Sequence, residues 1–118
     1  MGDYLHKRYE VRVQKDVKYA VGGVGFTKAL RYRDLKLDVY SPVGDSGALR
    51  PALILAFGGA FHRGSKETDE FGDAEGMSTP VADYCRLFAA RGYVCFCIDY
   101  RLTQEDCDGG VTPVLDPA

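Results

Sequence analysis

The chain has 118 residues, of which 46% are hydrophobic and 27% are charged, a composition typical of one soluble globular domain with a modest core. Its formal net charge of -2, from 15 basic and 17 acidic side chains, argues against nucleic acid or an anionic membrane surface as a partner. No apolar run approaches the ~20 residues of a membrane-spanning helix, and the start MGDYLHKRYE lacks the apolar core of a signal peptide. We therefore expect a cytoplasmic protein with no membrane partner.

Two alternating segments near the start predict half-buried strands. Tyr9 to Val21 and Leu30 to Tyr40 place apolar residues at about every second position. The glycines of VGGVGFTKA between them fit a hairpin or an irregular loop, so we expect an antiparallel pair at one edge of a sheet. GGVG is a weak candidate for a phosphate cradle, because neither nucleotide-binding spacing is met and no helix pattern follows. We expect no cofactor.

A turn-rich connection and an apolar strand come next. Ser41 to Arg50 contains GDSG, a tetrapeptide familiar around protease nucleophiles, but we interpret Ser46 as a turn residue because no histidine stands in a suitable context. Ala52 to Phe57 has no polar alternation and predicts a central parallel strand that is buried on both faces. The following pair Gly58-Gly59 fits either a tight turn or a loop that offers main-chain N–H groups to a ligand.

The second half of the pattern predicts a helix and one more strand. Thr79 and Pro80 suit the cap and first position of a helix, whose apolar stripe ends at Arg91-Gly92. Tyr93 to Tyr100 is again almost wholly apolar, and the remaining residues are a loop by composition. Strand, glycine loop, helix and strand form a βαβ unit. Ligands of such sheets bind at the carboxyl ends of the strands, which favours the ligand-facing interpretation of the glycines.

The cysteines are interpreted as core residues. Cys95 and Cys97 lie two apart in an apolar run, so on a strand both thiols point to one face. With Cys85 and Cys107 they lack the knuckle spacing of a structural zinc site, and we expect neither a metal nor a disulfide framework.

The motifs, taken in order, resemble those of the α/β-hydrolase esterases and lipases. FGGAF at 57–61 and RGS after it resemble an HGGG-type loop behind the third strand, and RGYVCFCIDYRL at 91–102 resembles a fourth strand that ends in D-Y-R-L. LDVYSP at 37–42 is similar to the end of the second strand. The resemblance covers about residues 9–105 and leaves 106–118 as a loop or tail. It implies an α/β fold, the N-terminal half of an α/β-hydrolase sheet, in which an antiparallel strand pair precedes the βαβ unit.

The resemblance also implies a role for the glycine loop. Acyl transfer passes through a negatively charged tetrahedral intermediate that main-chain N–H donors stabilise. By motif, the donors of this oxyanion hole are Gly59 and Ala60, and Gly58 permits the turn. Phe57 replaces the histidine of the motif and cannot make the side-chain hydrogen bonds that would brace the loop.

Other polar residues near the loop are assigned structural roles. His62 is interpreted as a loop residue and not a catalytic base. Asp99, Tyr100 and Arg101 leave the fourth strand near the same rim, where an acid beside an arginine favours an ion pair that holds loops together.

The nucleophile, acid and histidine of such a hydrolase are missing, because no serine lies in a G-x-S-x-G pentapeptide. We therefore expect residues 1–118 to be a single partial domain, the first half of a serine ester hydrolase for a small-molecule ester, inactive alone. One amphipathic helix cannot cover both faces of the sheet. In the family's strand order 1-2-4-3-5, the strand Ala52 to Phe57 would also lack its outer neighbour. The alternative is a non-catalytic interaction module whose open edge pairs with a partner chain or with itself.

Overall fold

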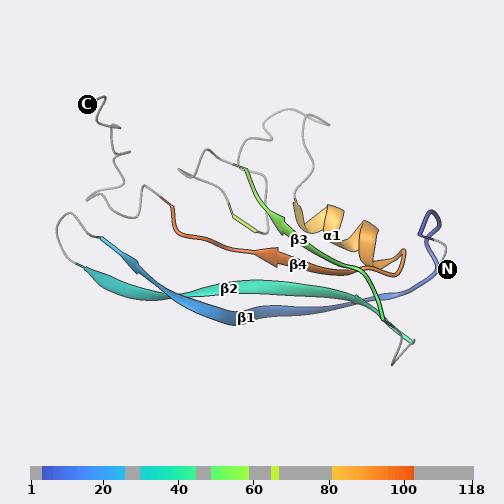
Figure 1. Ribbon diagram of the computed structural model, residues 1–118, viewed down its shortest axis with the longest axis horizontal. Helices are drawn as coiled ribbons and strands as arrows, with labels where there is room; N and C mark the ends of the chain where they lie inside the picture. The colour runs from blue at the N-terminus through green and yellow to red at the C-terminus, as the bar shows by residue number, and fades with distance from the viewer. Residues whose placement is uncertain (1–3, 26–29, 45–48, 59–64, 67–80, 103–118) are drawn as a thin grey trace.

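The computed structural model describes residues 4–25, 30–44, 49–58, 65–66 and 81–102. Five elements follow one another along the chain (Figure 1): β1 (Val11–Val24), β2 (Arg31–Pro42), β3 (Ala52–Ala56), α1 (Val81–Ala89) and β4 (Val94–Ile98). Each was predicted from the hydrophobic pattern of its segment. The α/β fold class, with an antiparallel pair followed by a strand, helix and strand, is confirmed.

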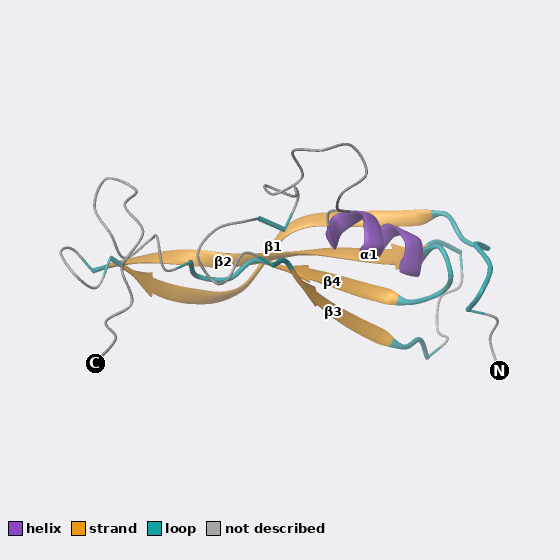
Figure 2. Cartoon of the chain, turned by 90° about the horizontal axis from the view of Figure 1, so that it is seen from above, coloured by secondary structure: helices purple, strands orange, loops and turns teal. Residues whose placement is uncertain are grey.

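The four strands form one mixed sheet in the order β1-β2-β4-β3. β2 pairs antiparallel with both β1 and β4, and β3 pairs parallel with β4. Figure 2 shows the strands side by side with the helix lying over them. β1 and β2 are much longer than their neighbours and form a ribbon that extends past β4 and β3 (Figure 1). This order agrees with the first four strands expected from the resemblance.

The glycines expected in a loop between the first two strands lie partly inside β1. Gly22 and Gly23 pair with Arg33 and Tyr32 of β2, so the prediction of a loop at these two positions was wrong. The physical reason is a close approach, because a Cβ atom on Gly22 would lie 2.7 Å from Cδ of Arg101. Glycine in a strand interior often marks such a crossing of another chain segment.

α1 covers one face of the sheet and makes the core with it. The buried cluster consists of Tyr40, Cys85, Ala89, Cys95 and Cys97. Its three cysteines are free thiols with no exposed surface, as expected for core residues, whereas Cys107 lies outside the described residues. Within the described ranges, no group of histidine, cysteine and acidic side chains could hold a metal ion, and no helix is long and apolar enough to cross a membrane.

The opposite face of the sheet carries no described element. Val39, Phe96 and Ile54 are cross-strand neighbours on this face, and Ile54 is 70% exposed. The prediction that the strand Ala52 to Phe57 is buried on both faces was therefore wrong for the described residues. The position of β3 at the edge of their sheet agrees with the expectation that this strand lacks its outer neighbour. An unbroken apolar run shows that both faces of a strand suit burial, but it does not show which segment covers them.

α1 ends in a Schellman motif. Gly92 donates its N–H to Ala89 O at 3.0 Å, Tyr93 donates to Phe88 O at 3.2 Å, and the Phe88 and Tyr93 rings meet edge to face at 5.3 Å. Gly92 has φ +106°, which side chains rarely adopt. A Cβ there would also lie 3.2 Å from Nη1 of Arg50. The backbone angle therefore favours glycine at this turn into β4, and a side chain there would also have to displace Arg50.

Substitution at this turn should separate the two effects. We expect Gly92→Ala to lower the free energy of unfolding by more than about 1 kcal/mol, because it adds crowding to an unfavourable φ. Gly44→Ala is the matched control, since Gly44 has φ +99° but no atom of the described residues within 4 Å of its Cβ position. Urea denaturation measures both, and equal losses would show that crowding at position 92 contributes nothing.

Candidate functional site

Three chain segments meet at the carboxyl ends of β3 and β4. Phe57 and Gly58 follow β3, residues 99–102 follow β4, and Ser65 and Lys66 lie beside them. This is the edge at which open α/β sheets bind their ligands. Of the predicted oxyanion-hole residues, Gly58 is described, whereas Gly59 and Ala60 lie outside the described residues, as does His62.

Gly58 is exposed and faces open space. Among the described residues, no atom lies within 4 Å of the position that a Cβ would take, and the φ of Gly58 is not in the left-handed region. Neither crowding nor backbone angle requires glycine here. What the missing side chain provides is room beside the main chain, where a ligand could approach.

The residue before Gly58 is held by Tyr100. The rings of Phe57 and Tyr100 stack with centroids 4.4 Å apart and planes inclined by 14°. The Tyr100 hydroxyl donates a hydrogen bond to the main-chain carbonyl of Phe57. Burial, followed by the nearby charge of Asp99, raises the pKa of Tyr100, so that the hydroxyl keeps its proton at neutral pH.

Asp99 and Tyr100 are in turn tied to the β1–β2 ribbon. Asp99 Oδ2 lies 3.2 Å from Nη1 of Arg33, and the same guanidinium donates through Nη2 to Tyr100 O at 3.1 Å. Tyr19 donates its hydroxyl to the carbonyl of Asp99. The arginine that pairs with Asp99 thus comes from β2, a partner that sequence neighbourhood did not reveal.

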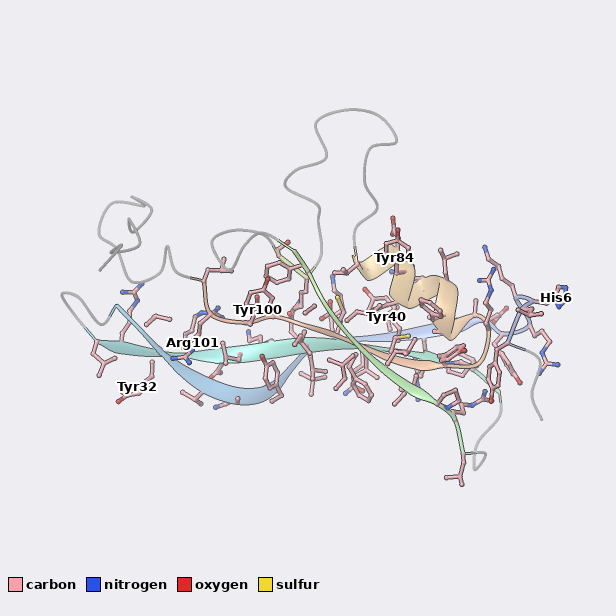
Figure 3. The ribbon with its side chains drawn as sticks, turned by 45° about the horizontal axis from the view of Figure 1, so that its top comes forward. His6, Tyr32, Tyr40, Tyr84, Tyr100 and Arg101 are labelled. Atoms are coloured by element: carbon pink, nitrogen blue, oxygen red, sulfur yellow. The ribbon has the colours of Figure 1, made fainter. Side chains whose placement is uncertain are left out.

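Arg101 makes a further contact with the β1–β2 ribbon. It crosses over Gly22 and donates to Gly23 O at 3.1 Å. Figure 3 shows Tyr100 above the β1–β2 ribbon and Arg101 against the ribbon.

Lys66 forms the second tie, through a cluster of charges in which Lys66 and Asp38 are buried and Asp16 is exposed. The Lys66 side chain is 8% exposed, and Nζ lies 3.0 Å from Oδ1 of both Asp38 and Asp16. Asp38 is fully buried on β2, and its Oδ1 also accepts the N–H of Asp16 at 2.9 Å. The carbonyl of Lys66 accepts a hydrogen bond from the Cys97 thiol at 3.1 Å. Lys66 is therefore fixed to β1, β2 and β4.

A backbone irregularity in β1 places Asp16 in this cluster. The register between β1 and β2 shifts between Gln14 and Val17, and Asp16 adopts φ 58°, a left-handed conformation that aspartate tolerates better than most residues. The hydrogen bond and charge of Lys66 lower the pKa of the Asp16 carboxyl. Sequence analysis missed the cluster because the two acids and the lysine look like ordinary solvated charges in their own segments.

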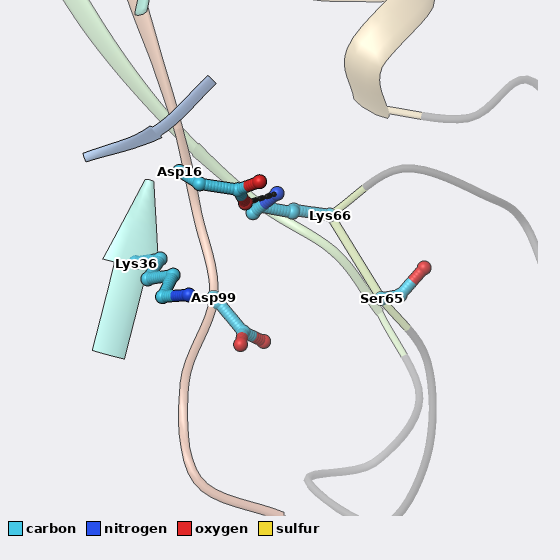
Figure 4. Close-up of a pocket in the computed structure, with 5 residues that line it drawn as sticks. All are labelled: Asp16, Lys36, Ser65, Lys66 and Asp99. Atoms are coloured by element: carbon cyan, nitrogen blue, oxygen red, sulfur yellow. Dashed lines mark hydrogen bonds and ion pairs between the residues drawn. The ribbon is translucent and has the colours of Figure 1, made fainter. Parts of the chain in front are cut away.

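A polar pocket of about 210 Å³ opens beside Lys66. Its lining consists of Asp16, Lys36, Ser65, Lys66 and Asp99 (Figure 4). These side chains offer hydroxyl, ammonium and carboxylate groups. His6, the one histidine among the described residues, lies at the far end of the molecule from Tyr100 (Figure 3). The described part of the chain therefore brings no serine, histidine and acid together.

Comparison with known proteins identifies the fold. No family model matches the chain, and no curated protein matches its sequence. A solved structure that is similar is esterase B from Lactobacillus rhamnosis (HN001), with a TM-score of 0.53 and 21% sequence identity. The match covers 86% of this chain and 26% of the esterase, so the chain spans about a quarter of that protein's length. The chain has the fold of part of an esterase.

The buried charge pair gives a prediction on stability. We expect Lys66→Met to destabilise the fold by about 3–5 kcal/mol, because it leaves the buried Asp38 carboxylate without its cation. The double variant Asp38→Asn with Lys66→Met should recover part of this loss, since no full charge stays buried. Lys36→Met, which removes an exposed lysine from the same pocket, should stay within about 0.5 kcal/mol of the parent. Urea unfolding compares the parent chain with the three variants. Equal effects of the two single lysine variants would contradict the role of Lys66 as the cation that stabilises the buried Asp38.

Proposed function

We propose that this chain is the N-terminal segment of a serine carboxylic-ester hydrolase, to which it contributes the oxyanion-hole loop. The observation that carries the proposal is the fold it shares with part of an esterase, together with a glycine loop that leaves β3 at the ligand-binding edge of the sheet. The substrate class is small-molecule carboxylic esters.

In the proposed mechanism, the main-chain N–H groups of Gly59 and Ala60 donate to the oxygen of the tetrahedral intermediate. Such donors act on charge that develops only during the reaction, and loss of one donor typically costs about 10²–10³ in kcat. The open space beside Gly58 supports this role, because the substrate must approach the main chain closely. The serine, acid and histidine must come from polypeptide other than these residues, since no G-x-S-x-G pentapeptide occurs in them.

The test begins with the reading frame that encodes the chain. We expect it to continue beyond Ala118 into a G-x-S-x-G elbow, and we expect the longer polypeptide to hydrolyse p-nitrophenyl acetate with inhibition by serine-directed reagents. The 118-residue chain alone should show no saturable turnover. In the longer protein, Ala60→Pro, which deletes the N–H, should lower kcat about 10²–10³-fold, whereas Ala60→Gly should leave it nearly unchanged.

Three results would count against this function. Saturable hydrolysis by the 118-residue chain that serine-directed reagents inhibit would refute the proposal that the catalytic serine, acid and histidine lie outside these residues. A frame without an elbow would refute the hydrolase. Full activity in Ala60→Pro would remove the oxyanion role from this loop.

A second candidate function is favoured by the exposed edge of β3. This five-residue strand has no charged residue, and Ile54 at its centre is 70% exposed, whereas edge strands usually carry charges or proline that block pairing. A non-catalytic module could pair this edge with a partner chain or with a second copy of itself. If so, light scattering should detect a defined complex that Ile54→Lys abolishes, and a monodisperse monomer at all concentrations would exclude self-pairing.

A further inference from the structure

The peptide that joins Phe57 to Gly58 is held by its oxygen. Because a peptide unit is planar, the carbonyl of Phe57 and the N–H of Gly58 are parts of one rigid group and point in opposite directions. A hydrogen bond that fixes the carbonyl therefore also fixes the direction of the Gly58 N–H and the path on which the chain leaves β3. The Tyr100 hydroxyl makes this bond.

We propose that Tyr100 is a positioning residue for the candidate loop, and that its hydroxyl sets the orientation of the 57–58 peptide. The inference rests on the proposed function for its catalytic meaning, but its structural content concerns described residues alone. Phe57 has no side-chain group that could donate a hydrogen bond, so its own side chain cannot orient the peptide. Tyr100, which comes from the chain after β4, supplies the donor.

Tyr100 can serve as a reference point because its own main chain is fixed on both sides. Its N–H donates to Asp99 Oδ1 at 3.1 Å, and its carbonyl accepts from Arg33 at 3.1 Å. Arg33 belongs to β2, and Tyr19 of β1 bonds the carbonyl of Asp99. Hydrogen bonds from both strands of the ribbon thus fix the position of Tyr100. Through its side chain, Tyr100 in turn fixes the peptide at the end of β3.

The ring and the hydroxyl of Tyr100 have separable effects. The stacked ring fills space against Phe57, which is 6% exposed, and any aromatic ring of this size would do so. Only the hydroxyl orients the carbonyl. Among the described residues, the charged groups next to Tyr100 are Asp99 and Arg33. Burial, followed by the charge of Asp99, raises the pKa of the phenol above its ordinary value of 10.0. The donor is therefore present at neutral pH and is lost only in alkaline solution.

The experiment is nuclear magnetic resonance of the 118-residue chain, labelled with ¹³C at the Phe57 carbonyl and ¹⁵N at Gly58. Tyr100→Phe keeps the ring and removes the donor, so both resonances should move. Tyr32→Phe, at a tyrosine that is 71% exposed, is the matched control and should leave them unchanged. In the parent chain, the Phe57 carbonyl resonance should also move as Tyr100 titrates above pH 10, and this titration should be absent from Tyr100→Phe.

The parent titration needs no variant, so it tests the inference even if Tyr100→Phe does not fold. A Phe57 carbonyl resonance that is unaffected by both the substitution and the titration would overturn the positioning role, whatever the protein catalyses. Movement in both experiments supports it. In an active longer polypeptide, Tyr100→Phe should lower kcat about 10-fold or more with little change in KM. An absent esterase activity would refute the proposed function and leave the spectroscopic result standing.

Discussion

The structure at the carboxyl ends of β3 and β4 depends on the ion pair between Lys66 and Asp38. Asp38 lies on β2 with no exposed surface, and a carboxylate in such a place is tolerated only with a cation and hydrogen bonds. Lys66 supplies the cation from a segment 28 positions further along the chain, and Asp16 supplies an N–H through the irregularity in β1. One buried charge thereby fixes three segments that share no sequence neighbourhood.

The two ties on either side of residues 59–64 have different physical character. Before this segment, Phe57 is held by a stacked ring and a neutral hydrogen bond from Tyr100, which depend little on salt. After it, Lys66 is held by the buried charge of Asp38, which salt screens little, and by the more exposed charge of Asp16. Both ties lead back to the antiparallel ribbon of β1 and β2. The residues on either side of the candidate loop, Phe57 and Lys66, are therefore positioned mainly by the β1–β2 ribbon and less by the short parallel strands.

Sequence alone predicted the elements because their patterns are local. Alternation marked β1 and β2, and the stripe from Val81 to Ala89 marked α1 with its glycine stop. The strand order came from the resemblance. The pairing of Asp99 with Arg33 and the crossing of Gly22 by Arg101 were not predictable, because each joins positions more than 60 residues apart. The apolar run of β3 wrongly predicted burial on both faces, although the single amphipathic helix already indicated that one face of the sheet has no helix over it. An apolar run reports what a strand tolerates and not what covers it.

The three buried thiols between α1 and the sheet can report how often the helix separates from the sheet. Cys85 lies on the helix and Cys95 and Cys97 on β4, and none has any surface in contact with solvent. A thiol-alkylating reagent can therefore reach these sulfurs only when the helix separates from the sheet or, for Cys97, when the segment of Lys66 moves away from it. The rate of their alkylation, resolved by peptide, measures how often the layer over β4 opens, without any label added to the molecule.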